Sequence, residues 1–173
     1  MKCLSLWEPY ASFVERGWKL METRSWPTSY RGVLAIHAAK TKKTVDMAIP
    51  LMEAAGCDDA EVSDFADWRR EWPLGKIIAV AQLVDCVPVE TIIPHLTQRE
   101  RTFGDYAPGR FVWILMDVRP LNPHIPHKGM QGLWEVPALV ARSIAVQLLK
   151  PLPGVLDDRD GTRQVVRDSV DQG

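Results

Sequence analysis

Residues 17–24 read Gly-Trp-Lys-Leu-Met-Glu-Thr-Arg and connect two predicted elements of the fold. A short helix of about two turns is expected to begin at Glu8-Pro9, because proline is tolerated at the first helical position. Gly17 ends that helix, since glycine readily adopts the backbone conformation that follows a helix C-terminus. Residues 20–25 then read as an extended strand. The stretch therefore predicts a helix–turn–strand unit near the start of the chain.

Three charged side chains of this unit are candidates for one site. Glu22 and Arg24 should point to the same face of the strand, because strand side chains alternate with a period of two. Lys19 has the opposite parity, so it can join them only if it lies in the turn after Gly17, before the strand becomes regular. Under that condition we expect the three side chains to meet in one pocket.

Aromatic side chains are dense around the same stretch, and the chain as a whole has seven tryptophans. Those near the charged residues are Trp7, Tyr10, Phe13, Trp18, Trp26 and Tyr30. Large flat side chains beside cations and a carboxylate suit a polar, anionic or planar ligand.

The rest of the chain has the pattern of a small sheet domain. Further strands are predicted at residues 2–7, 33–38, 76–87, 110–118 and 133–136. Helices are predicted at residues 45–55, kinked or interrupted at Pro50, and at residues 62–72. Residues 120–132, with three prolines and two glycines, read as a loop. Because strands and helices do not alternate as βαβ units, the sequence predicts a small, mainly β barrel or α+β domain.

Charge changes sign along the chain. Residues 1–43 hold eight basic and three acidic residues, a net of +5, whereas residues 44–73 hold two basic and eight acidic residues, a net of −6. We expect the acidic helical segment, residues 44–73, to pack on the sheet with its carboxylates facing water. The net charge of the whole chain is −1, so any nucleic-acid binding would need a local patch such as the positive N-terminal third.

Length and cysteine usage narrow the class of protein. A chain of 173 residues is expected to form one domain, and three widely spaced cysteines do not form a disulfide framework. No signal pattern or membrane-spanning run is present, so we expect a cytoplasmic protein with no membrane association. His124 and His127 lack cysteine or carboxylate partners at ligand spacing, so neither a metal site nor a cofactor is expected. Residues 138–173 are expected to be a peripheral or weakly ordered extension of a domain at residues 1–137.

Several motifs together resemble one known family. They are Leu4-Ser5-Leu6-Trp7-Glu8-Pro9, Gly17-x-Lys19-x-x-Glu22-x-Arg24, Tyr30-Arg31-Gly32, Ile36-His37-Ala38, Phe103-Gly104-Asp105 with Gly109-Arg110, and Gly129-x-Gln131-Gly132-Leu133-Trp134. In order and spacing they resemble bacterial and phage members of the ASCH domain family, part of the PUA-like superfamily, from residue 1 to about residue 137.

The resemblance implies both a fold and a class of function. The implied fold is a barrel of about five or six strands with flanking helices and a cleft beside the motif. The implied function is RNA or nucleotide binding. Some small members are amidohydrolases of N4-acetylated cytidine, in which a threonine three positions after the motif lysine is the nucleophile, assisted by the lysine and a distant glutamate. Glu22 stands at that position here, and Thr23 has the opposite strand parity, which disfavours the same chemistry.

The candidate ligand-binding residues combine cations, a carboxylate and stacking rings. Lysine and arginine suit phosphate, a carboxylate can accept a base's exocyclic amine, and aromatic rings stack on bases. The set is Trp7, Lys19, Glu22, Arg24, Trp26, Tyr30, Arg31, Lys40 and Arg110, the last from the family match. The competing structural interpretation is that Glu22 and Arg24 form an internal salt bridge. His37 is predicted as a core residue; the alternative is that it lines the cleft.

Three functions stay open on the sequence. The leading hypothesis is an RNA- or nucleotide-binding protein that uses the cleft at the motif. The alternative is a small hydrolase of a modified nucleoside or RNA, in which Lys19 and Glu22 form the catalytic acid/base pair. The third is a protein-interaction module, which exposure of Trp68 and Trp72 would favour.

Overall fold

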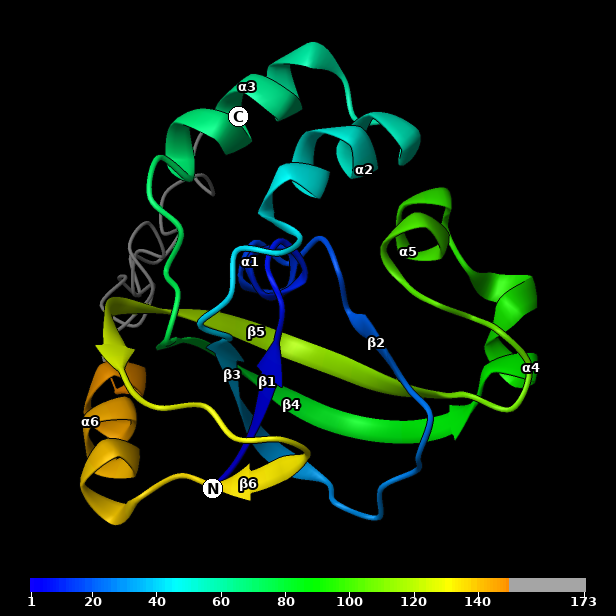
Figure 1. The fold of residues 1–173 in the computed structure, drawn as a ribbon. Coiled ribbons are helices and arrows are strands. Elements are labelled where there is room, and N and C mark those ends of the chain that lie inside the picture. Colours follow the sequence, from blue (N-terminus) through cyan, green and yellow to red (C-terminus); the bar gives the residue numbers. More distant parts are fainter. Residues whose placement is uncertain (150–173) are drawn as a thin grey trace, which may run out of the picture.

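A curled, mixed six-stranded sheet forms the body of the structure, a computed structural model that describes residues 1–149 (Figure 1). Its strand order is β2-β5-β4-β3-β1-β6, and only β1 and β3 run parallel. The strands are β1 (Lys2–Leu6), β2 (Met21–Arg24), β3 (Gly32–Ala38), β4 (Lys76–Pro88), β5 (Phe111–Pro126) and β6 (Leu133–Glu135). The prediction of a mainly β, barrel-like fold of about six strands with flanking helices is confirmed, in the form of a half-barrel with β2 and β6 at its edges.

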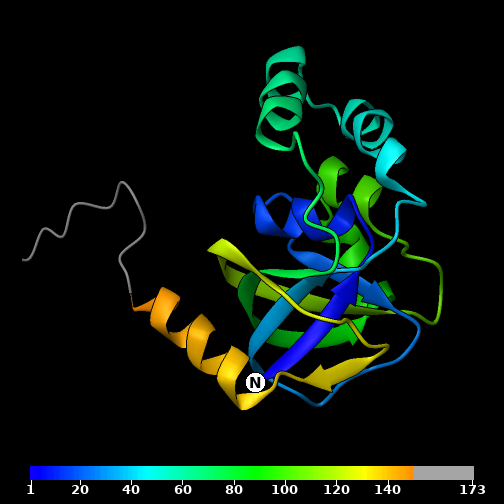
Figure 2. The same cartoon turned by 60° about the vertical axis from the view of Figure 1, so that its left-hand side comes forward.

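Short helices flank the sheet. They are α1 (Tyr10–Glu15), η1 (Val45–Met47), α2 (Ala48–Ala54), α3 (Asp59–Trp68), α4 (Val89–Ile92), η2 (Ile93–His95), α5 (Gln98–Phe103) and α6 (Ala138–Leu148). Figures 1 and 2 show α2 and α3 beyond α1, at the end of the molecule opposite β6. Helix α6 lies against the sheet through Ile144, which is fully buried.

Helix α1 joins the sheet core to the helical core. Val14 is buried with the apolar residues of β1, β3 and β4, whereas its neighbour Phe13 is buried among α2, α3 and α5. The ring of Phe13 stacks on Phe103 at 4.2 Å between centroids. The acidic helical segment therefore packs mainly on α1 and α5, with Phe65 and Met52 as its buried anchors.

The segment 120–126 is strand rather than loop, so the loop prediction was wrong there. Strand β5 continues to Pro126, and residues 120–126 pair with β4 alone, because β2 pairs only with residues 111–114. Proline has no N–H to donate, and it is tolerated where a strand has an unpaired edge. The register shifts between β4 and β5 lie nearby, and a strand also tolerates proline at such irregularities.

Pro50 does not interrupt a helix. A 3-10 turn at Val45–Met47 comes first, and α2 begins at Ala48, which places Pro50 in the first turn. The N–H groups of a first turn have no helical partner, so a proline costs little there. The next helix, α3, begins earlier than predicted because Asp58 and Glu61 form a capping box. Of the extension predicted at residues 138–173, residues 138–148 form α6, which packs on the sheet, and residues 150–173 lie outside the described residues.

Candidate functional site

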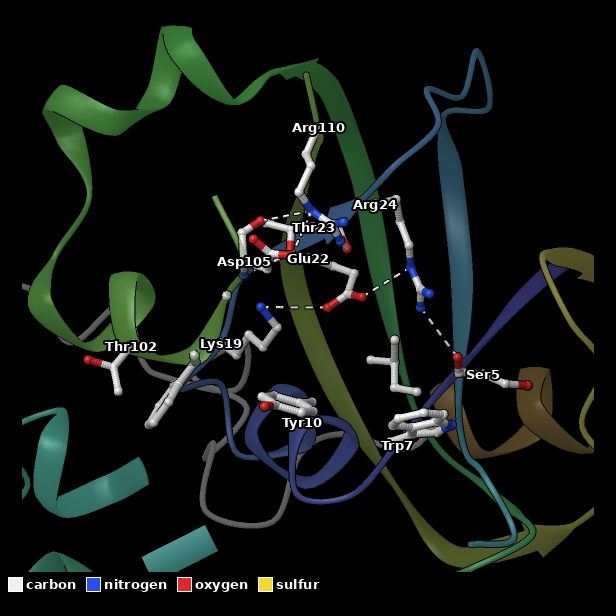
Figure 3. Close-up of a pocket in the computed structure, with 13 residues that line it drawn as sticks. Ser5, Trp7, Tyr10, Lys19, Glu22, Thr23, Arg24, Thr102, Asp105 and Arg110 are labelled. Carbon is white, nitrogen blue, oxygen red and sulfur yellow. Dashed lines mark hydrogen bonds and ion pairs between the residues drawn. The ribbon is translucent and has the colours of Figure 1, made fainter. Parts of the chain in front are cut away.

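The side chains of Lys19, Glu22 and Arg24 meet beside the sheet edge, with the carboxylate between the two cations (Figure 3). Lys19 Nζ lies 3.5 Å from Glu22 Oε2, and Arg24 Nε lies 3.1 Å from Glu22 Oε1. Arg24 Nη2 also donates to the Ser5 carbonyl oxygen at 3.3 Å, which ties β2 to β1. The arrangement has the expected geometry: two side chains on one strand face, with Lys19 reaching in from the turn.

The backbone before β2 explains how Lys19 reaches this point. Gly17 has φ of +74°, and the N–H groups of Trp18 and Lys19 both donate to the Phe13 carbonyl oxygen at the end of α1. The chain is thus held against the helix until the strand begins. The Lys19 side chain is 1% exposed, and its ammonium donates to the Met21 carbonyl oxygen at 2.5 Å.

A buried carboxylate on α5 fixes the start of the strand. Glu100 accepts hydrogen bonds from the N–H groups of Leu20, at 2.5 Å, and Met21, at 3.3 Å. Burial raises the pKa of the Glu100 carboxyl, while these N–H groups and the charge of Lys19 oppose that rise. Nothing near Glu100 in the sequence indicated this role, because the contact joins segments about 80 residues apart.

The three motif residues line a cavity of about 390 Å³, with both polar and aromatic walls. That volume lies within the range of pockets that hold small organic ligands. Trp7 and Tyr10 supply aromatic surface, and Trp7 is 53% exposed. The other lining residues are Ser5, Leu6, Thr23, Thr102, Phe103, Gly104, Asp105 and Arg110. The ion pair between Glu22 and Arg24 and the open cavity therefore coexist, so the two sequence interpretations are compatible.

Arg110 lines the cavity from β5's N-terminal end, as the resemblance implied. Its Nε donates to the Asp105 carbonyl oxygen at 3.0 Å, and its Nη2 donates to the Thr23 carbonyl oxygen at 3.3 Å. The Thr23 hydroxyl oxygen accepts from the Asp105 N–H at 3.1 Å. This threonine, the alternative nucleophile considered above, is thus bonded into the wall of the cavity.

A second, larger cavity adjoins the first and shares Ser5, Trp7 and Arg24 with it. Its volume is about 1,010 Å³, and Lys40 lines it. His37 also lines it while being 1% exposed, so the histidine is both a buried residue and part of a cavity wall. Its Nε2 lies 3.0 Å from the His127 carbonyl oxygen, and burial lowers its pKa.

Three of the predicted ligand-binding residues lie away from both cavities. Trp26 packs edge-on against Trp113, with 4.7 Å between ring centroids. The Tyr30 hydroxyl donates to the Val33 carbonyl oxygen at 2.6 Å. Arg31 pairs with Asp85 at 2.7 Å on the surface. Nearness to the motif in sequence suggested these residues, but the chain after β2 turns away from the site.

The polar lining residues outside the predicted ligand-binding set come from other elements. Ser5 lies on β1, Tyr10 on α1 and Thr102 on α5, and tertiary packing alone brings them together. Asp105 belongs to the Phe103-Gly104-Asp105 motif, so a sequence signal for that part of the wall was present. Within residues 1–149, no group of three or more His, Cys, Asp or Glu residues could hold a metal ion. Nor does any helix of that part of the chain have the length and apolarity to cross a membrane.

Comparison with solved structures supports the fold. The ASCH protein of Zymomonas mobilis superposes with a TM-score of 0.53 at 17% sequence identity, covering 84% of this chain and 93% of that one. Two point variants of the same protein each superpose with a TM-score of 0.52 at 18% identity.

Sequence comparison finds relatives that are much longer than this chain. Activating signal cointegrator 1 of Homo sapiens is 26% identical over 156 residues, or 86% of this chain, and the protein of the same name from Mus musculus matches equally. The chain spans about a quarter (24%) of the length of these relatives. The ASCH domain family model matches residues 4–124, most of the described chain. The chain therefore belongs to the ASCH domain family, whose PUA-like fold is associated with RNA binding.

Proposed function

We propose that the protein binds RNA or a nucleotide, with a base in the cavity that Lys19, Glu22 and Arg24 line. The observation that carries the proposal is the Glu22 carboxylate, held between two cations in the wall of a cavity that is also lined by aromatic rings. Cations alone would suit any anion. A fixed carboxylate beside aromatic surface suits a base, which carries exocyclic amines and a flat face.

The hydrogen-bonding capacity of Glu22 is not exhausted by its partners. An ionised carboxylate offers about four lone-pair sites, and the two ion pairs use one on each oxygen. The free sites can accept from the exocyclic amine of a base, as carboxylates do with cytosine. Lys19 and Arg24 hold the carboxylate in place from either side, which is the role that the internal ion pairs serve in this proposal.

The partly exposed ring of Trp7 is suited to stacking. It borders the cavity, so it can cover a base whose edge faces Glu22. Base–aromatic stacking contributes about 1–3 kcal/mol per base. Unpaired bases are the natural target, because a base inside a duplex offers neither face for stacking nor a free Watson–Crick edge.

Fluorescence titration with single-stranded RNA and with nucleotides tests the proposal. Trp7→Ala should weaken binding by about 5- to 150-fold, the equivalent of the stacking energy, without unfolding the protein. Glu22→Gln should weaken binding of ligands that present an amine while it retains the shape of the side chain. Arg31→Ala, a surface arginine that lines neither cavity, is the control. Unchanged affinity in both Trp7→Ala and Glu22→Gln would refute the proposal.

The second candidate function is hydrolysis of a modified nucleoside such as N4-acetylcytidine, or of RNA. It is favoured by the buried ammonium of Lys19, 3.5 Å from Glu22, because a desolvated lysine–carboxylate pair can exchange a proton during catalysis. Incubation with acetylated nucleosides and with RNA, with and without divalent metal, separates this function from binding alone. Absence of turnover on all of them would exclude it.

A further inference from the structure

The second cavity differs chemically from the first, although the two share a wall. Its charged lining residues are Arg24, Lys40 and Lys128, and no Asp or Glu lines it. The first cavity, in contrast, balances its cations with Glu22 and Asp105. A cavity lined by cations without a carboxylate has a positive potential, which attracts an anion rather than a base.

The cationic side chains of the second cavity are attached to well-defined backbone. The methylene stem of Lys40 lies against Gly75, where an added Cβ would be 3.7 Å from it. Lys128 follows His127, whose ring stacks on Trp134 with centroids 5.1 Å apart. Both lysines line the cavity, and neither forms an ion pair within residues 1–149.

The floor of the cavity depends on a glycine in the last motif that the sequence singled out. A Cβ on Gly129 would lie 2.6 Å from His37 Nδ1 and 2.8 Å from Ser5 Oγ, so only glycine lets this loop close over the two strands. His37 Nδ1 is buried and has no hydrogen-bond partner among the described residues. The loop thus places Lys128 in the wall of the same cavity as Arg24 and Trp7, two residues that also line the first cavity.

Arg24 connects the two cavities. It lines both, and its guanidinium has five donors, of which Nε faces Glu22 and one on Nη2 faces the Ser5 carbonyl oxygen. The remaining donors are available to a phosphate group. A single arginine that orients the base-reading carboxylate and faces a cationic cavity suits a ligand with a base and a phosphodiester side by side.

We propose that the second cavity binds the phosphodiester backbone next to the base held in the first cavity, so that the ligand is a single-stranded oligonucleotide rather than a free nucleoside. This inference rests on the proposed function, because it places the base in the first cavity. It assigns to Lys40 and Lys128 the phosphate contacts, and to Arg24 the junction between backbone and base.

The test is the salt dependence of binding, measured by fluorescence anisotropy with a labelled single-stranded RNA. For single strands, the slope of log affinity against log salt concentration is about −0.7 for each phosphate contact. The double variant Lys40→Ala/Lys128→Ala should bind the RNA more weakly at low salt, with a slope shallower by about 1.4. Its affinity for a free nucleoside should stay at the wild-type value.

A matched control removes the same charge from the same part of the surface. Lys42 and Lys43 are exposed and line neither cavity, so Lys42→Ala/Lys43→Ala should keep the wild-type slope. If Trp7→Ala and Glu22→Gln weaken RNA binding but the Lys40/Lys128 double variant matches wild type in affinity and slope, the backbone subsite is refuted and the base site stands. If wild type binds neither RNA nor nucleotide, both proposals fail.

Discussion

The ammonium group of Lys19 lies 3.5 Å from the Glu22 carboxylate, and the lysine side chain is 1% exposed. A buried lysine needs a partner, because transferring an isolated ammonium out of water is very costly. Glu22 is that partner, and it also faces Arg24 at 3.1 Å. The residue proposed to read a base is therefore also the residue that balances a buried charge, so its loss affects both ligand binding and stability.

Glu22→Ala is expected to lower the free energy of unfolding by about 3–5 kcal/mol, because it leaves the buried Lys19 ammonium without the carboxylate that it pairs with. Urea unfolding followed by tryptophan fluorescence measures the loss. The control is Glu135→Ala, which removes an ion pair of 2.7 Å with Lys2 at the surface. An exposed pair contributes about 0–1 kcal/mol, so equal losses in the two variants would contradict the assignment.

Arg69 links the acidic helical segment to the sheet. Its guanidinium pairs with the buried Glu15 of α1 and stacks on Trp68 at 3.8 Å from the ring centroid, and Glu15 Oε1 lies 2.6 Å from His124 Nε2 on β5. Arg69→Ala removes one partner of a buried pair and should lower the free energy of unfolding by about 3–5 kcal/mol.

The neighbouring arginine is the control for that prediction. Arg70 pairs with Asp67 at 3.6 Å, and its side chain is 81% exposed. Arg70→Ala should therefore change the free energy of unfolding by no more than about 1 kcal/mol. Thermal melts of the two variants side by side measure the difference, and a loss confined to Arg70→Ala would contradict the role given to Arg69.

Glu8 should give the stability a pH dependence opposite to that of most carboxylates. Its side chain is fully buried, and this desolvation raises its pKa, against hydrogen bonds from Ser12 and the charge of Arg69. Since the pKa is higher in the folded state, the folded state binds the proton more tightly. The resulting stability is fully present below the ordinary carboxyl pKa and is lost as the pH rises through the folded pKa.

Glu8→Gln removes this titration. The free energy of unfolding of the variant, relative to wild type, should therefore increase as the pH rises above about 4, the ordinary carboxyl pKa. Urea unfolding across this range measures it, with Glu53→Gln, at an exposed carboxylate of α2, as the control. A difference between Glu8→Gln and wild type that stays constant with pH would show that Glu8 does not titrate with a raised pKa.

The geometry of a single strand was enough to predict how the motif residues meet, but not which residues of other elements join them in the cavity. The parity of β2 placed Glu22 beside Arg24, and the same rule confined Lys19 to the turn. Those arguments need only the geometry of one strand. Tyr10 and Thr102 reach the cavity from α1 and α5, two helices that pack together through the stacked rings of Phe13 and Phe103.

The fold, too, could be predicted where it depends on local sequence and not where it depends on strand pairing. Continuous β-branched runs gave the central strands, whereas the prolines of residues 120–126 were read as a loop. Their cost depends on whether a second strand pairs with that part of β5, which the local sequence does not reveal. The same limit explains Trp26 and Arg31, whose side chains lie near the motif in sequence and pack elsewhere in space.

Gly129→Ala tests the close contact on which the second cavity depends. The new Cβ would lie 2.4 Å from His37 Cε1, so either the loop or the ring must move, and we expect the free energy of unfolding to fall by about 1–3 kcal/mol. A double-mutant cycle with His37→Ala separates this clash from a general loss of glycine at the position. Removing the imidazole relieves the two shortest contacts and leaves the one with Ser5 Oγ at 2.8 Å, so adding the alanine should lower the free energy of unfolding by less than it does in wild type. If Gly129→Ala has the same effect on stability in both backgrounds, contact with His37 is not the reason for a glycine there.

Because the displaced loop carries Lys128, we expect Gly129→Ala alone to make the salt dependence of RNA binding shallower as well. Met130→Ala, at an exposed neighbour, should change stability little.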